Sequence, residues 1–163
     1  MSQQKIVFLI NSLDGGGAER VVSTLLNNFV DECDCYLILL EDKISYELDG
    51  RIKIIILNKN FSTNNGLIKF LSLPILGYKV SKIIKQYNFT QVVSFLYRSN
   101  YINILAKYFT KHKVIISERI APTSMYADDS ISSKISKFLI KLLYNKSDLI
   151  ISVSKAIKYA HKR

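Results

Sequence analysis

The sequence predicts an α/β domain built on a doubly wound parallel sheet with helices on both faces. Three observations support this fold class. Apolar runs of strand length recur along the chain, helix-length segments with an apolar stripe alternate with them, and short links join the two. Strands and helices that alternate in this way form parallel sheets through right-handed crossovers. Because the chain has 163 residues, we expect one domain over residues 1–163.

The predicted elements begin with a strand, a glycine-rich loop and a helix. Residues 5–11 form a continuous apolar run, which is typical of a strand buried on both faces. Residues 12–17, Ser-Leu-Asp-Gly-Gly-Gly, interrupt this run and indicate a loop. Residues 18–29 then carry apolar side chains at the spacing of an amphipathic helix.

The same reasoning predicts the remaining elements. Further strands are expected at residues 35–40, 51–57, 91–95, 113–118 and 149–153, and helices at residues 67–87, 101–111 and 130–144. Pro74 and Gly77 are expected to kink or split the longest helix. Because the sequence ends soon after another helix begins, we expect it to be one domain of a longer protein.

Composition and charge narrow the classes of function. No apolar run reaches the ~18 residues of a membrane-spanning helix, and the first residues do not resemble a secretory signal, so we expect a cytoplasmic protein. Cys33 and Cys35 are expected to be structural. Residues 1–60 hold 6 basic and 9 acidic side chains, whereas residues 61–163 hold 17 and 4. This asymmetry predicts an anionic partner, namely nucleic acid, a membrane surface or a phosphate-bearing substrate, although lysines that only face solvent would give the same pattern.

The glycine loop is the first candidate site, because ligands of open parallel sheets bind beyond the carboxyl ends of the strands. Gly15, Gly16 and Gly17 would let backbone N–H groups approach a diphosphate at the start of the following helix. The dinucleotide fingerprint G-x-G-x-x-G fits less well, since it needs a small residue where this chain has Arg20. A tight turn without a ligand would also explain the glycines.

Polar side chains after the fourth and fifth predicted strands are further candidates. Arg98 suits a phosphate or carboxylate, and Asn100 suits sugar hydroxyls. Glu118 and Arg119 are expected to point into the same cleft or to pair with each other. We expect His112 on the surface, and the sequence assembles neither a catalytic triad nor a metal site, so no metal or other cofactor is expected.

The predicted helix at residues 67–87 carries a basic face. Lys79, Lys82 and Lys85 lie beside aromatic residues in a segment that has no acidic residue. Basic and aromatic side chains together suit an anionic membrane surface. The alternative is that the apolar side of this helix packs on the sheet while the lysines only face solvent.

Several motifs of this chain occur together in one known family. Residues 5–22, which contain Gly-Gly-Ala-Glu-Arg between a strand and a helix, resemble the opening of the family 4 (group 1) glycosyltransferases. Ser94-Phe-Leu96 with Asn100, Ser117-Glu-Arg119 and the run Asp148-Leu-Ile-Ile-Ser-Val-Ser-Lys155 are similar to motifs that follow in the same order in that family. The resemblance covers most of the chain and is closest to bacterial enzymes that extend polyprenyl-diphosphate-linked or cell-surface glycans, including N-acetylgalactosamine transferases.

This resemblance implies a fold and an activity. Members have the GT-B fold, in which two Rossmann-like domains face each other and a sugar is transferred with retention and without a metal. This chain would be the N-terminal, acceptor-side domain, and the nucleotide-sugar donor would bind through a C-terminal domain that the chain lacks. We therefore expect the chain alone to be inactive. A lipid-linked acceptor would place it at the inner face of the cell membrane, held there by the basic helix.

The resemblance also assigns roles to single residues. Gly15, Gly16 and Gly17 would meet the donor diphosphate, Ser12, Arg98 and Asn100 would border the acceptor, and Glu118 and Arg119 would be catalytic residues at the reacting sugar. Many relatives have a histidine at the position of Arg119. Two other classes are kept as alternatives: an NAD(P)-binding module of an oxidoreductase, and a basic nucleic-acid-binding domain, for which no recognised motif is present.

Overall fold

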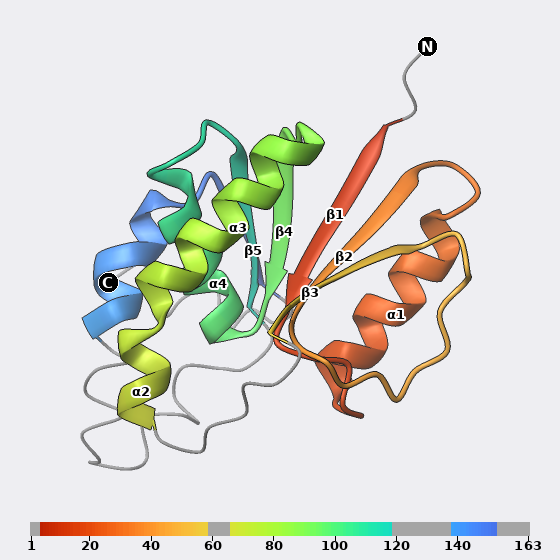
Figure 1. The fold of residues 1–163 in the computed structure, drawn as a ribbon, viewed down its shortest axis with the longest axis horizontal. Helices are drawn as coiled ribbons and strands as arrows, with labels where there is room; N and C mark the ends of the chain where they lie inside the picture. The colour runs from red at the N-terminus through yellow and green to blue at the C-terminus, as the bar shows by residue number, and fades with distance from the viewer. Residues whose placement is uncertain (1–3, 59–65, 119–137, 153–163) are drawn as a thin grey trace.

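A six-stranded parallel sheet with strand order β3-β2-β1-β4-β5-β6 forms the centre of the computed structural model (Figure 1). The structure describes residues 4–58, 66–118 and 138–152. Its strands are β1 (Lys5–Ile10), β2 (Asp34–Glu41), β3 (Lys53–Asn58), β4 (Gln91–Phe95), β5 (Lys113–Glu118) and β6 (Leu149–Ser152). Its helices are α1 (Gly17–Phe29), α2 (Gly66–Leu71), α3 (Leu73–Tyr87), α4 (Tyr97–Lys107), residues 138–143 and a 3-10 turn, η1 (Tyr144–Lys146). The predicted fold class is confirmed.

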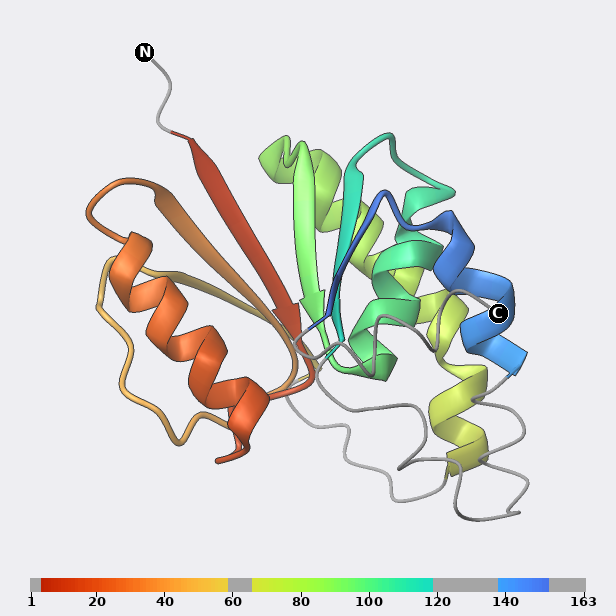
Figure 2. The same ribbon diagram turned by 180° about the vertical axis from the view of Figure 1, so that it is seen from behind.

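Helices cover both faces of the sheet. Figures 1 and 2 show α1 on one face, and α3, α4 and the helix at residues 138–143 on the other. The side chains of β2 alternate between two cores: Tyr36 and Ile38 pack toward α3 and α4, whereas Leu37 and Leu39 pack toward α1. This two-sided burial is the reason that the strands read as continuous apolar runs.

The long predicted helix is two helices that meet at Ser72. Pro74 lies in the first turn of α3, where a proline costs no hydrogen bond. Gly77 does not interrupt the helix, so the expectation that it helps to split the segment is wrong. A side chain at Gly77 would stand 2.9 Å from Cβ of Leu105 in α4, and the glycine instead lets the two helices approach closely.

Helix α4 begins at Tyr97, four residues before the start that the sequence predicts. The backbone of Leu96, directly before it, has φ 69° and ψ 150°, a conformation that costs an L-residue on the order of 1–3 kcal/mol. This turn reverses the chain at once, so the segment expected as a polar loop becomes the first helical turn. Arg98 and Asn100 are therefore held by a helix.

Candidate functional site

The candidate site lies at the carboxyl edge of the sheet, between β1 and β4. The strand order reverses here, because the chain moves outward from β1 through β2 to β3 and then returns to β4 on the other side. Ligands of doubly wound sheets bind at this switch point. Helices α1 and α4 both begin at the same edge, and neither amino terminus is capped by a side-chain hydrogen bond. Two positive helix ends therefore face the switch point.

The glycine loop after β1 is held in place by its neighbours. Leu13 is fully buried, and its backbone pairs with the segment around Ile44. The hydroxyl of Tyr46 donates to the carbonyl of Gly16 at 2.9 Å. Gly15 has φ +89°, which only glycine adopts without strain, so this glycine has a conformational reason apart from any ligand.

A carboxylate of the chain itself lies next to the predicted diphosphate position. A Cβ added to Gly16 would clash with the Glu19 carboxylate, which shows that this side chain folds back from the first turn of α1 over the start of the helix. An acid at this position stabilises a helix amino terminus. A diphosphate that binds to Gly16 must therefore displace Glu19, whereas Gly17 has open space where its side chain would be.

The first turn of α4 is fastened to the β1–β2 half of the sheet. The guanidinium of Arg98 pairs with Glu41, at the end of β2, over 3.1 Å. The hydroxyl of Ser99 donates to Oδ1 of Asn11, directly after β1, at 2.8 Å. Glu41 therefore binds the chain's own Arg98 in this structure, at the position where a dinucleotide site would use an acid to hold a ribose.

The same turn is also fastened to the β5 side of the sheet. Nδ2 of Asn100 donates to the Tyr144 hydroxyl of η1 at 3.2 Å. The carboxyl group of Glu118, the last residue of β5, hydrogen-bonds with Tyr144 and Tyr97 and is 1% exposed. Burial raises the pKa of Glu118 from 4.5 to about 7, and the two tyrosine hydroxyls oppose this rise.

The structure places the predicted site residues at different depths. Ser12 and Arg98 are half-buried at the carboxyl edge. Asn100 is fully buried, so the expectation that its amide lies open at the rim is wrong. The expectation that Glu118 points into a cleft is also wrong, because its carboxyl is enclosed by α4 and η1. Arg119 lies outside the described residues.

His112 was expected on the surface, but it is buried, with 3% of its area exposed. Its Nε2 donates to Oδ1 of Asn103 at 2.9 Å, since the amide nitrogen of Asn103 already donates to Val92 and Ser94. Its Nδ1 lies 2.5 Å from the Thr110 hydroxyl. Burial, assisted by the charge of Lys107, lowers the pKa of His112 to about 4.

Sequence reasoning also missed the roles of Tyr144 and Asn11. Tyr144 was expected only as the end of a helix. Asn11 was expected among the polar residues that follow the first strand, but its contact with Ser99 was not. Neither has a local signal, because their partners Asn100 and Ser99 are 44 and 88 residues away in the chain.

Surface hollows of the described residues lie away from the carboxyl edge, and these residues contain no metal-ligand group. Two surface hollows, of about 470 and 290 Å³, are lined by residues away from the carboxyl edge, including His112 in one and Tyr108 in the other. Across residues 4–58, 66–118 and 138–152, no group of three His, Cys, Asp or Glu side chains could hold a metal ion. No helix in these ranges is long and apolar enough to cross a bilayer.

Two curated proteins of Campylobacter jejuni subsp. jejuni serotype O:2 are similar to this chain, whereas no family model matches it. N-acetylgalactosamine-N,N'-diacetylbacillosaminyl-diphospho-undecaprenol 4-alpha-N-acetylgalactosaminyltransferase is 41% identical over 153 residues, covering 93% of this chain and 42% of that protein. GalNAc-alpha-(1->4)-GalNAc-alpha-(1->3)-diNAcBac-PP-undecaprenol alpha-1,4-N-acetyl-D-galactosaminyltransferase is 29% identical over 160 residues, covering 98% of this chain and 43% of that protein. The chain therefore spans less than half the length of these relatives.

Two solved structures share the fold. Sucrose-phosphate synthase from Thermosynechococcus elongatus superposes with a TM-score of 0.71 at 11% identity, over 91% of this chain and 42% of that one. The apo lipopolysaccharide outer core galactosyltransferase WaaB superposes with a TM-score of 0.70 at 16% identity, over 96% of this chain and 41% of that one.

The chain has the Rossmann-like α/β fold of GT-B glycosyltransferases, as the sequence resemblance predicted. It is, more particularly, a homologue of the two Campylobacter N-acetylgalactosaminyltransferases. An NAD(P)-binding oxidoreductase module is not favoured by these relatives.

Proposed function

We propose that this chain is the acceptor-side domain of a retaining glycosyltransferase that moves a sugar from a nucleotide-sugar donor to a lipid-linked glycan. The observation that carries this proposal is the 41% identity, over 93% of the chain, to a transferase whose name specifies a diphospho-undecaprenol acceptor. The carboxyl edge between β1 and β4 supplies a fitting location, because a diphosphate is attracted by the amino termini of α4 and, once Glu19 is displaced, of α1, and by Arg98.

The roles of single residues form part of this proposal. Backbone N–H groups of the glycine loop at residues 15–17 would meet the donor diphosphate, and Ser12 and Arg98 would border the acceptor. Arg98 uses Nη1 for Glu41, and a guanidinium has five N–H donors, so it retains donors for a phosphate oxygen. Arg119 is proposed to lie at the reacting sugar, and no metal or cofactor is proposed.

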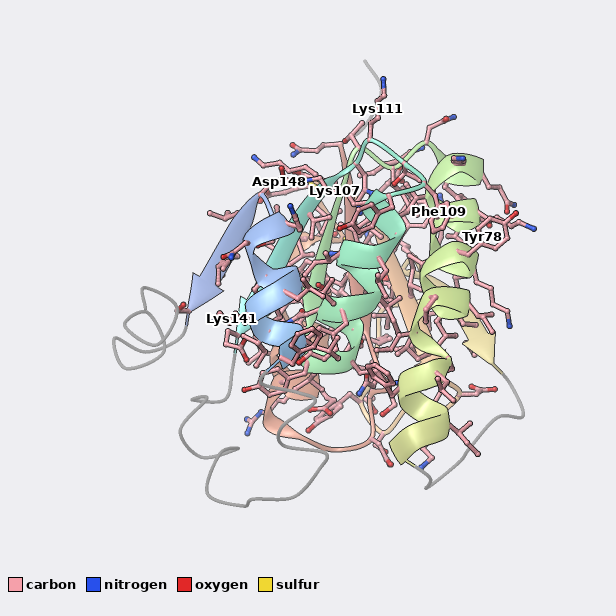
Figure 3. All side chains as sticks on the ribbon, turned by 90° about the vertical axis from the view of Figure 1, so that its left-hand side faces the viewer. Tyr78, Lys107, Phe109, Lys111, Lys141 and Asp148 are labelled. Carbon is pink, nitrogen blue, oxygen red and sulfur yellow. The ribbon has the colours of Figure 1, made fainter. Side chains whose placement is uncertain are left out.

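We further propose that α3 and the end of α4 rest on an anionic membrane surface. Lys79, Lys82 and Lys85 are exposed on α3, and Nζ of Lys82 lies 4.8 Å from the centre of the Tyr78 ring. Tyr78 contacts Phe109 edge to face (Figure 3), and each of the two residues is 47% exposed. Aromatic rings flanked by lysines suit the headgroup region of a bilayer.

The distribution of charge along the sequence also supports a membrane-binding surface on α3. There is no Asp or Glu between Asp49 and Glu118, a range that includes α2, α3 and α4. Each Lys or Arg near an anionic surface contributes about 1 kcal/mol of attraction. A lipid-linked acceptor at this surface would then be close to the domain that receives it.

The proposed activity is tested with the complete gene product. It is incubated with radiolabelled UDP-N-acetylgalactosamine, and then with other nucleotide sugars, in the presence of diphospho-undecaprenol that carries N-acetylgalactosamine-diacetylbacillosamine. We expect label to move into the organic-soluble lipid fraction, and none to move when the 163-residue chain is used alone. The same disaccharide without lipid diphosphate is the control. Failure to label lipid with any donor would contradict the proposal.

A further inference from the structure

The first turn of α4 spans the two halves of the sheet at the switch point. Arg98 and Ser99 extend toward the ends of β1 and β2, where they contact Glu41 and Asn11. Tyr97 and Asn100, on either side of them in the sequence, contact the opposite half through Glu118 and Tyr144. The position of Arg98 therefore depends on contacts that its own side chain does not make.

Glu118, the last residue of β5, is buried on the β5 side of this turn. Among the residues that the structure describes, the titratable groups that face its carboxyl are Tyr97 of α4 and Tyr144 of η1. Tyr101 of α4 packs on the Tyr144 ring, with ring centroids 6.0 Å apart. A carboxyl enclosed by hydroxyl groups is more costly to ionise than one in water. Its protonated form has an O–H to donate as well as oxygens that accept from the tyrosines.

We propose that Glu118 is a positioning residue which, with Tyr144, fixes the first turn of α4 and so holds Arg98 in place for the diphosphate of the lipid-linked acceptor. This inference rests on the proposed function. It differs from the catalytic role that the sequence resemblance implied for Glu118, because a side chain that is 1% exposed does not reach a bound sugar. The pKa near 7 adds a consequence. Ionisation of Glu118 above neutral pH buries a charge beside the turn, and the hydrogen bonds from the two tyrosine hydroxyls offset only part of that cost, so the packed turn is destabilised.

The test is a double-mutant cycle on acceptor binding by this chain. The probe is a short-chain polyprenyl diphosphate that carries one N-acetylgalactosamine, and its Kd is measured by calorimetry for the wild type, Arg98→Gln, Glu118→Ala and the double variant. Loss of a hydrogen bond between charged groups weakens binding about 10- to 100-fold, which we expect for Arg98→Gln. Glu118→Ala should show part of this loss, and the double variant should bind no more weakly than Arg98→Gln alone.

Glu118→Gln is the conservative variant that separates positioning from a general effect on folding. Glutamine keeps a donor and an acceptor but does not ionise, so we expect wild-type affinity at pH 6 and no weakening between pH 6 and pH 8.5. The wild type should bind more weakly as the pH rises through about 7. Because Glu118→Gln retains the buried contacts, its pH dependence can be interpreted even if Glu118→Ala does not fold. Circular dichroism would show whether Glu118→Ala folds.

The outcomes distinguish the two proposals. If Arg98→Gln binds the probe normally, the acceptor site of the proposed function is wrong. If Arg98→Gln weakens binding but the two losses add in the double variant, or if Glu118→Gln retains the pH dependence of the wild type, the positioning role of Glu118 is overturned. UDP is the second probe, and an equal loss of UDP affinity in Arg98→Gln would assign Arg98 to the donor and overturn the inference as stated.

Discussion

His112 and Glu118 are buried groups whose pKa values move in opposite directions for the same reason. Burial disfavours the charged form, so it lowers the pKa of His112 to about 4 and raises that of Glu118 to about 7. Neutral His112 makes its full contribution to the free energy of unfolding above pH 6.5, and this contribution is lost as the pH falls toward 4. Stability from protonated Glu118 is present below pH 4.5 and is lost as the pH rises toward 7.

We therefore expect the free energy of unfolding to change little between pH 4.5 and 6.5 in the wild type, because the two contributions nearly cancel. Each is on the order of 3 kcal/mol. In Glu118→Gln, stability should rise with pH over this range, and in His112→Gln it should fall. Urea denaturation followed by circular dichroism at several pH values measures both slopes. Equal slopes in the two variants would contradict these assignments.

Gly16 is the residue at which the glycine-loop prediction is most directly tested. Its φ of −85° allows a side chain, and the group that a Cβ would meet is the flexible carboxylate of Glu19, so Gly16→Val should fold. We expect the activity of the complete gene product to fall at least ~10-fold, because valine would block the approach of a phosphate to the backbone. Gly50→Ala, at a position with no atom near the added Cβ, is the control. Unchanged turnover in Gly16→Val would remove the loop from the site.

At the scale of elements, α3 is both a core helix and the proposed membrane surface. Its buried side, with Leu76, Val80 and Ile84, packs in the core shared with α4, while its lysines point outward. The two interpretations of this helix, as a packed core helix and as a basic surface, are therefore compatible. The aromatic partner Phe109 comes from beyond the end of α4, so the sequence of α3 alone did not show the whole surface.

Replacing Lys79, Lys82 and Lys85 with glutamate should release the protein from anionic vesicles. The change reverses three charges, which at about 1 kcal/mol for each lost attraction should weaken binding by at least ~100-fold at low salt. Co-sedimentation with vesicles of phosphatidylglycerol and phosphatidylcholine measures this. The matched control reverses three charges on the other half of the sheet, with Arg20→Glu, Lys43→Glu and Lys53→Glu. Equal loss in both triple variants would indicate a general effect of net charge rather than this surface.

For the whole molecule, the remaining alternative is binding of a nicotinamide dinucleotide. We expect no binding of NADH, because Glu41 is engaged by Arg98 and Glu19 covers the start of α1. Fluorescence transfer from the 10 tyrosines of the chain cannot be confused with tryptophan emission, since the chain has none. Saturable quenching at micromolar NADH would favour the oxidoreductase module and contradict the transferase proposal.

The fold was predictable from sequence because its signals are local. Continuous apolar runs gave each strand of the described sheet, and the residues of β4 and β5 agree with prediction at both ends. The depth of the site residues was not predictable. Asn100 and Glu118 were expected at an open rim. The turn at Leu96, which has a positive φ and starts α4 early, was not predictable because nothing about a leucine indicates such a turn. Their burial also requires Tyr144, which only the tertiary fold brings to them.

The junction between β1 and β4 also bears on how the molecule would yield to mechanical load. The two strands register only Phe8 with Val93 and Leu9 with Ser94, whereas β1 and β2 are in register along six residue pairs. A pulling force applied across the sheet would first part it along this seam, into two lobes that are each one contiguous stretch of chain. The first turn of α4 then links the two parts across the β1–β4 junction. Removing its hydrogen bonds to Asn11 and Glu41 should lower the force needed to separate them.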